Sequence, residues 1–247
     1  MKLRHAAATV ALATASLLAS APEGAFAMSV SPTHIELKSA GSKSRSSVVV
    51  RNTSAAPLPV EAVLKSLTVD RNGKSRSGAV SNDFLVFPPQ TLIRPGASQV
   101  FRLTWVGEPL IKKSRSFLLT LRQLPVRTKR APNQVQVVMA FGVVINVAPP
   151  RGRPALKLVA SSLARNRSGE RNPVITVYNP SPVHALLPDA TIRLRGRGWA
   201  KTLSSSFLDQ KVGIGLVQPG KRRRFVLPVT VPAGAGKVRA AIDFKPK

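Results

Sequence analysis

Short apolar runs that alternate with a period of two residues constrain this chain more than any other feature. Successive side chains of a β-strand point to opposite faces, so this period is typical of strands, whereas an α-helix repeats about every 3.6 residues. The runs in the first part of the chain are residues 48–50, 60–69, 90–94, 100–106, 117–124 and 135–147. Those in the second part are residues 156–161, 173–178, 190–194, 212–217, 224–231 and 238–244. No heptad or amphipathic helix stands out, and the pattern predicts an all-β fold.

Turn-forming residues separate the runs. Asn72-Gly73 favours a tight turn, and Pro95-Gly96 does so because proline presets φ and glycine accepts positive φ. Residues 149–154 begin and end with proline and predict a stiff linker. The parts on either side each have the length of an immunoglobulin-like sandwich, roughly 100 residues. We therefore predict two immunoglobulin-like β-sandwiches in tandem, with domains at residues 28–150 and 151–247.

The first 27 residues have the pattern of a secretory signal peptide. A basic start and an apolar segment at residues 6–21 precede Ala25-Phe26-Ala27, a small-x-small cleavage site. The apolar segment is shorter than the roughly 20 residues that a membrane-spanning helix needs. Residues 1–27 thus predict export, a mature chain that begins at Met28, a periplasmic location and no stable membrane insertion. The alternative is an N-terminal membrane anchor.

The chain is strongly basic, with 38 Lys and Arg against 10 Asp and Glu and a formal net charge of +28. Such an excess attracts polyanions such as nucleic acid, anionic lipid headgroups or acidic proteins. No basic helix, helix-turn-helix pattern or aromatic-rich RNA-binding motif accompanies it, so we predict no nucleic-acid partner. The charge leaves one alternative function open, an exported immunoglobulin-like binding protein for an acidic polymer or an envelope surface.

Residues suited to catalysis or metal binding are scarce. The absence of cysteine removes disulfides, thiolate catalysis and cysteine-based zinc sites. The mature chain has two histidines, His34 and His184, and the Pro-Ser-Pro turn before His184 predicts an exposed side chain. No nucleophile elbow provides the serine of a catalytic triad, and the few acidic residues offer no evident carboxylate pair. We predict no enzyme activity, no catalytic residue, no metal and no cofactor.

Several motifs occur in a characteristic order. Residues 87–96 begin with Phe-Pro-Pro and end with Pro-Gly, and Phe101-Arg102-Leu103 follows them. Residues 116–125 form an apolar strand that ends in Leu-Arg-Gln-Leu-Pro, and residues 135–149 form the longest apolar run. Asn179-Pro180-Ser181-Pro182 marks a turn in the second half. In this order and spacing the motifs resemble the periplasmic pilus chaperones, the PapD-like family, over nearly the whole mature chain.

The resemblance implies a chaperone that binds pilin subunits by donor-strand complementation. Family members lend their G strand to a subunit that lacks the last strand of its own fold, and deliver it to an outer-membrane usher. Backbone hydrogen bonds give affinity in such strand addition, and alternate side chains fill pockets. Val135, Val137 and Met139 share one face of that strand and are the expected donor residues. The periodicity alone allows an ordinary core strand, and we expect residues 141–147 to be core.

The family anchors the subunit's C-terminal carboxylate in the cleft between its domains. An arginine on the first strand and a lysine on the G strand do so, because a partly desolvated carboxylate needs charge-assisted donors. The corresponding positions here hold His34 and Val144. A histidine binds a carboxylate in this way only when it is protonated, and valine cannot.

Other basic residues are alternative anchors. Arg102 and Arg122 are the candidates within strands, and the simpler interpretation of each is a solvated strand position. Arg151 and Arg153 lie in the predicted linker, close to the cleft in such a layout, and are equally compatible with exposed linker charge.

Overall fold

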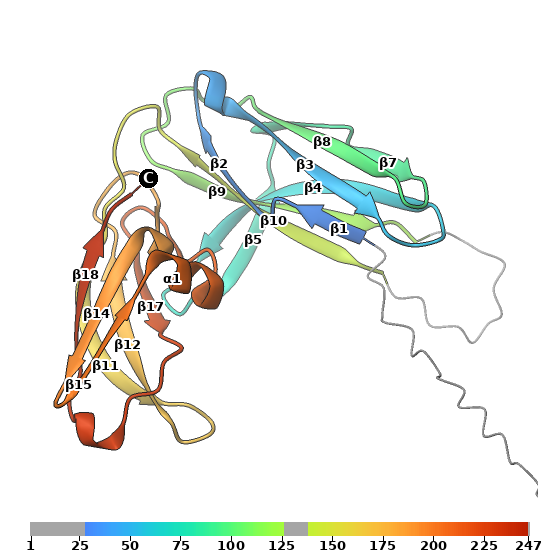
Figure 1. Ribbon diagram of the computed structural model, residues 1–247. Coiled ribbons are helices and arrows are strands. Elements are labelled where there is room, and N and C mark those ends of the chain that lie inside the picture. The colour runs from blue at the N-terminus through green and yellow to red at the C-terminus, as the bar shows by residue number, and fades with distance from the viewer. Residues whose placement is uncertain (1–27, 126–137, 247) are drawn as a thin grey trace, which may run out of the picture.

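The structure is a computed structural model and describes residues 28–125 and 138–246. Its strands form two β-sandwiches, each with its own hydrophobic core (Figure 1). The all-β, immunoglobulin-like prediction is confirmed. The domain boundary at residue 150 stays a prediction, and it falls in the segment between the last strand of the first sandwich and the first strand of the second.

Two sheets build the first sandwich. One has the strand order β1-β3-β8-β6, formed by Met28–Ser31, Arg45–Asn52, Ser98–Trp105 and Phe84–Phe87. The other has the order β2-β10-β9-β4-β5, formed by His34–Lys38, Ala140–Ala148, Arg115–Gln123, Leu58–Val69 and Ser75–Val80, and β7 (Gln90–Ile93) pairs with β4. β2 and β10 run parallel, and the other pairs are antiparallel. A short 3-10 turn, η1 (Ser42–Ser44), follows β2.

Alternating side chains fill the space between these sheets. In β3, Val48 and Val50 are buried while Val49 lies exposed between them, as a strand with one solvated face requires. Phe84 and Phe117, from opposite sheets, meet edge to face with ring centroids 5.2 Å apart. Aromatic pairs of this kind contribute about 0.5–1.5 kcal/mol beyond their burial. The contact ties the two sheets together at one end.

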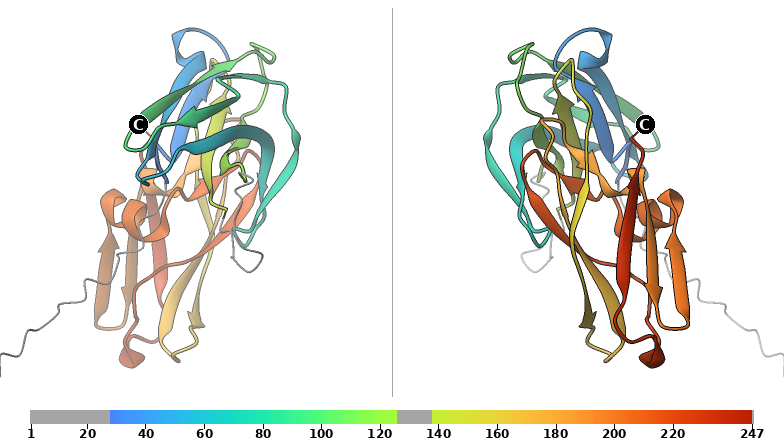
Figure 2. Two further views of the ribbon diagram at one scale, coloured as in Figure 1. Left: turned by 90° about the vertical axis from the view of Figure 1, so that its right-hand side faces the viewer. Right: turned by 90° about the vertical axis from the view of Figure 1, so that its left-hand side faces the viewer.

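The second sandwich is likewise built from two main sheets, each of three strands. The order β11-β12-β17 comprises Lys157–Arg165, Arg171–Tyr178 and Arg222–Val226, and the order β15-β14-β18 comprises Trp199–Leu203, Ala190–Gly196 and Arg239–Phe244. Two short strands, β13 (Ala185–Leu186) and β16 (Leu216–Val217), pair with each other. The 3-10 turns η2 (Leu187–Asp189) and η3 (Ala233–Ala235) complete it. Figure 2 shows β18 running back toward the first sandwich, so the C-terminal end lies at the junction.

One helix departs from the sequence prediction. A strand over residues 212–217 was predicted, but α1 (Ser205–Val212) ends where that strand was to begin, and only Leu216–Val217 are extended. The Ser204 hydroxyl accepts a hydrogen bond from the Phe207 N–H at 3.2 Å and caps the helix. Gly213, at φ 73°, ends it. Within the part of the chain that the structure describes, no helix has the length and hydropathy needed to cross a bilayer.

Several hydrogen bonds join the sandwiches away from the linker. The side chain of Gln218 donates to the Leu67 carbonyl at 2.9 Å and accepts from the Val69 N–H at 3.0 Å. The Arg224 N–H donates to the Arg71 carbonyl at 2.7 Å. The hairpin between β4 and β5 therefore rests on the second sandwich.

Candidate functional site

The first half of β10 has a neighbouring strand on only one side. Its backbone pairs with β9 from Ala140 to Val147, whereas β2 joins its other side only from Val144 onward. No other described strand pairs with residues 140–143, so this stretch presents an open edge. The unpaired N–H and C=O groups of such an edge are available to an added strand.

The residues before this edge include the predicted donor residues. Met139 lies half-buried against the first core, and its carbonyl accepts from the Gln123 N–H at 2.9 Å, which extends the ladder with β9. Val138 points to the opposite face and is 48% exposed. Val135 and Val137 lie outside the described residues, so the donor face stays a prediction.

The prediction of a core strand over residues 141–147 holds from Val143 onward, whereas Phe141 is half-buried and Gly142 is exposed. Val143, Ile145 and Val147 alternate along the strand and have no exposed surface. They belong to the same buried cluster as Phe101 and Phe117. These side chains are committed to the first sandwich, and from Val144 onward the strand is closed on both edges.

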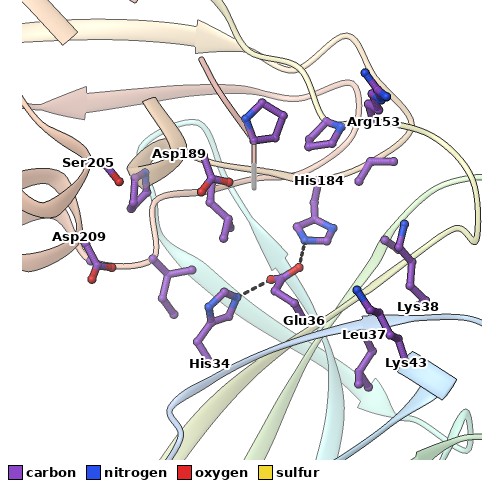
Figure 3. A pocket seen from close by; sticks show the side chains of 18 of the residues that line it. His34, Glu36, Leu37, Lys38, Lys43, Arg153, His184, Asp189, Ser205 and Asp209 are labelled. Carbon is purple, nitrogen blue, oxygen red and sulfur yellow. Dashed lines mark hydrogen bonds and ion pairs between the residues drawn. The ribbon is translucent and has the colours of Figure 1, made fainter. Parts of the chain in front are cut away.

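A cleft of about 1380 Å³ separates the sandwiches on the β2 side. Residues of β2, the linker, the segment 183–189, α1 and Pro246 line it. Figure 3 shows His34 and Glu36 reaching into it from one side and His184 from the other.

The carboxylate of Glu36 joins the sandwiches at the centre of this cleft. One oxygen accepts from His34 Nε2 at 2.5 Å, and the other accepts from His184 Nε2 (Figure 3). The Asn146 amide donates to the first oxygen at 2.8 Å. Glu36 and His184 belong to different sandwiches, so their bond crosses the junction.

His184 is buried, at 5% exposure, and the prediction of an exposed side chain was wrong. The turn before it folds back because the Asn179 amide donates to the carbonyls of Val183 and Val217, at 2.8 and 2.9 Å. His184 then meets Ser114, whose Oγ lies 3.0 Å from both the backbone N and the Nδ1 of the histidine. With Nδ1 held by this hydroxyl, Nε2–H is directed at Glu36.

Two opposing effects set the pKa of Glu36. Burial raises the pKa of this carboxyl. Hydrogen bonds from His184, His34 and Asn146, together with the charge of His184 when protonated, outweigh burial and lower the pKa to about 2. Glu36 is therefore a carboxylate of the chain's own that already occupies both histidines. Among the described residues, no group of His, Cys, Asp and Glu has the arrangement of a metal site.

The mouth of the cleft carries basic side chains. Lys38, Lys43 and Arg153 lie around the Glu36–His184 pair (Figure 3). Lys38 Nζ donates to the Pro149 carbonyl at 3.3 Å, and no ion pair holds Lys43 or Arg153 within the described chain. This group can receive an anion.

Known proteins share the sheet arrangement and the sequence around this site. The profile of a family described as "Pili and flagellar-assembly chaperone, PapD N-terminal domain" matches residues 27–150, which include both sheets of the first sandwich and all of β10. The chain belongs to this chaperone family. The predicted resemblance is thereby confirmed, and the family is one of assembly chaperones rather than enzymes.

Individual relatives agree with the assignment. "Probable fimbrial chaperone protein ElfD" of Escherichia coli K12 is 28% identical over 153 residues, a match that spans 59% of this chain and 59% of the relative. The class 5 fimbriae chaperone CfaA superposes with a TM-score of 0.53 at 15% identity, covering 89% of this chain and 99% of CfaA. The structure of Salmonella enterica SafA pilin in complex with the SafB chaperone gives a TM-score of 0.53 at 13% sequence identity. The match covers 89% of this chain and 96% of the matched chain. At these identities the structural matches show a shared fold.

The predicted anchor residues of the family site fall in different places. His34 lies in the cleft and directly opposite Val144 on β10, and their equivalence to the family's basic pair stays a prediction. Arg122 lies on β9 opposite Ala140, one strand in from the open edge, and its side chain pairs with Glu61 at 2.6 Å.

The remaining basic candidates lie mostly outside the cleft. Arg102 is exposed on the outer face of the first sandwich, between Ser47 and Phe87. Of the linker candidates, Arg153 lines the cleft and Arg151 does not.

Three polar residues that bond to Glu36 or His184 were not singled out in the sequence: Glu36 itself, Asn146 and Ser114. Glu36 follows His34 by two positions, and side chains two apart share a face of an extended strand, so this spacing was a usable signal. Asn146 interrupts an apolar run, and a polar residue at a core position calls for a partner. Ser114 carried no such signal, because its role depends on where the second sandwich docks.

Proposed function

We propose that this chain is a periplasmic chaperone that binds fimbrial subunits by donating β10 and the segment before it as an added strand, and delivers them to an outer-membrane usher. The observation that carries the proposal is the open edge at residues 140–143, next to an apolar segment of a chain that belongs to the pilus chaperone family. Val135, Val137 and Met139 are the proposed donor side chains.

The local chemistry of the edge supports strand addition. An open edge invites aggregation unless it is short, blocked or used. Here Ala140 and Gly142 are small and exposed, so a partner strand can approach the backbone closely. Met139 continues in register with β9, which pre-orders this end of the proposed donor segment for pairing. Pre-ordering lowers the entropy cost of binding.

The subunit's carboxylate terminus is proposed to bind at the basic mouth of the cleft. His34, the residue at the family position, already donates to Glu36, so an incoming carboxylate would have to compete with an internal one. Arg153 and Lys43 are charged, line the same cleft and have no carboxylate partner among the described residues. We propose these two as the anchor, with Arg122 contacting the subunit beside the open edge. Arg102 keeps no role in this proposal.

The location follows from the same reasoning. The family acts on exported subunits, and residues 1–27 have the sequence pattern of a signal peptide, although they lie outside the described residues. Cleavage after Ala27 would place Met28 at the start of β1.

Co-expression tests this function. The full chain is expressed in a bacterial periplasm with a fimbrial subunit that lacks its own last strand, and the pair is isolated at moderate and at high salt. Strand addition rests on backbone hydrogen bonds and apolar burial, so the complex should survive high salt. A complex that forms only at low salt would instead favour the alternative, binding through the basic surface, and would contradict the proposal.

A further inference from the structure

The second sandwich carries an arginine cluster on its outer face. β14 lies between β15 and β18 (Figure 1), and its side chains alternate strictly: Ile192 and Leu194 are buried, whereas Arg193 and Arg195 are exposed. Arg239 of β18 lies directly opposite Arg195 and is also exposed. We call Arg193, Arg195 and Arg239 the arginine face.

This arrangement is unfavourable in the isolated protein. Like charges directly opposite each other on neighbouring strands destabilise a sheet. No described carboxylate forms an ion pair with any of the three arginines. The acid on the same face is Asp243, which lies opposite Thr191 and contacts Lys245 at 3.5 Å. An external anion between the guanidinium groups would remove the repulsion.

The neighbours of the arginine face leave it flat and accessible. Ala200 and Thr202 lie opposite Arg195 and Arg193 on β15, and Ala241 lies opposite Arg193 on β18. These small side chains cover none of the guanidinium groups. Guanidinium forms paired hydrogen bonds with phosphate oxygens, so a flat array of phosphates fits this face.

We propose that the arginine face binds the surface of an anionic phospholipid bilayer. The chemistry favours lipid over an acidic protein, because a stable protein interface needs apolar or aromatic anchors at its centre, and this face has only alanine and threonine. It also disfavours nucleic acid, since single strands stack on aromatic side chains and duplexes are held by elements that enter a groove.

The proposal adds to the chaperone function and does not depend on it. The open edge of β10 and the cleft are formed by other elements, so a subunit and a bilayer can be bound at the same time. Membrane contact would hold the loaded chaperone at a bilayer surface, and the strong positive charge of the whole chain would assist the encounter.

Vesicle binding tests the proposal with the full chain. Partitioning onto phosphatidylglycerol-containing vesicles is compared with that onto pure phosphatidylcholine vesicles. The test variant is the triple R193Q, R195Q, R239Q. The matched control is R45Q, R51Q, R102Q, which removes the same charge from exposed positions on the first sandwich.

The two triple variants should differ strongly. We expect the wild type to bind the anionic vesicles only, the test variant to lose roughly 100-fold in partitioning, and the control to lose about twofold at most. Equal losses in both variants would mean that net charge alone attracts the chain, and would overturn the proposal. Failure of the wild type to bind anionic vesicles, or tighter binding to duplex DNA than to the vesicles, would overturn it too.

Discussion

The two ends of β10 lie in opposite environments on a single strand. At residues 140–143 the strand has one neighbour, an open edge and two small exposed residues, Ala140 and Gly142. From Val144 onward it is closed by β2 and β9, and Asn146 takes part in the Glu36 network at the junction of the sandwiches. The comparison separates two tasks. One end has the edge at which we propose that a partner strand is added, and the other joins the two sandwiches.

Charge follows the same division. At the open end, the Arg122–Glu61 pair lies on the surface, where its arginine is 53% exposed. At the closed end, Glu36 meets a histidine that is almost fully buried. A substitution should therefore change binding at the open end and stability at the closed end.

The largest expected effect is on subunit capture at the open end. Met139→Asp places a charge on the proposed donor face, and burying it in a subunit groove is costly. Capture of a co-expressed fimbrial subunit should fall at least about 100-fold. The matched control is Val138→Asp, which puts the same charge on the exposed opposite face and should leave capture within about threefold. Equal losses in the two variants would contradict the division of faces, provided circular dichroism shows both to be folded.

Stability should respond most at the closed end. His184→Ala removes a buried imidazole that bonds Ser114 and Glu36, and should lower the free energy of unfolding by about 2 kcal/mol. The comparison variant is His34→Ala, whose side chain bonds the same carboxylate but is 23% exposed; it should cost less than about 1 kcal/mol. Urea unfolding measures both values. The reverse order would show that the junction does not depend on the buried histidine.

The pH dependence of stability should identify Glu36. Its pKa lies at about 2 in the folded protein, below the ordinary value of 4.5. A carboxyl with a lowered folded pKa stabilises the fold above its unfolded pKa, and this contribution disappears as the pH falls through the folded pKa. Since the side chain is 43% exposed, we expect a loss of only about 1 kcal/mol between about pH 5 and pH 2.

Urea unfolding across that pH range separates Glu36 from the other acids. The Glu36→Gln variant should lack this part of the pH dependence, whereas Glu61→Gln should retain it. If the free energy of unfolding depends on pH in the same way in the wild type and in Glu36→Gln, Glu36 does not cause this loss of stability.

The smallest effect is expected for the surface pair near the open end. Arg122→Ala breaks the ion pair with Glu61, but exposed pairs contribute little because water and salt screen them. The free energy of unfolding should change by less than about 0.5 kcal/mol. A change above about 2 kcal/mol in the same urea titration would show that the open end also supports the fold.

Much of the fold was predictable because it depends on local alternation. The runs at residues 60–69 and 117–124 became β4 and β9 with ends shifted by two residues or fewer. The prediction of a strand over residues 212–217 was wrong. Their apolar residues suit a strand, but Ser204 before them caps a helix that extends to Val212. β5 (Ser75–Val80) is exposed throughout and has no alternating apolar pattern, so only its pairing with β4 makes it a strand.

The candidate site was predictable in part. The positions of His34 and Val144 followed from the family pattern, and the parallel register of β2 and β10 places them side by side. The burial of His184 was not predictable, since it depends on how the second sandwich docks against Ser114. Local sequence specifies a turn there but carries no information on that long-range contact.

Hydrogen exchange of the backbone tests strand donation most directly, because it does not rely on altered side chains. The full chain is compared alone and in complex with a fimbrial subunit. The account predicts that amides within residues 138–143 gain protection on binding, while amides at residues 144–148, already closed by β2, change little. Unchanged exchange at residues 138–143 in a complex that forms, with protection appearing elsewhere, would contradict strand donation by β10.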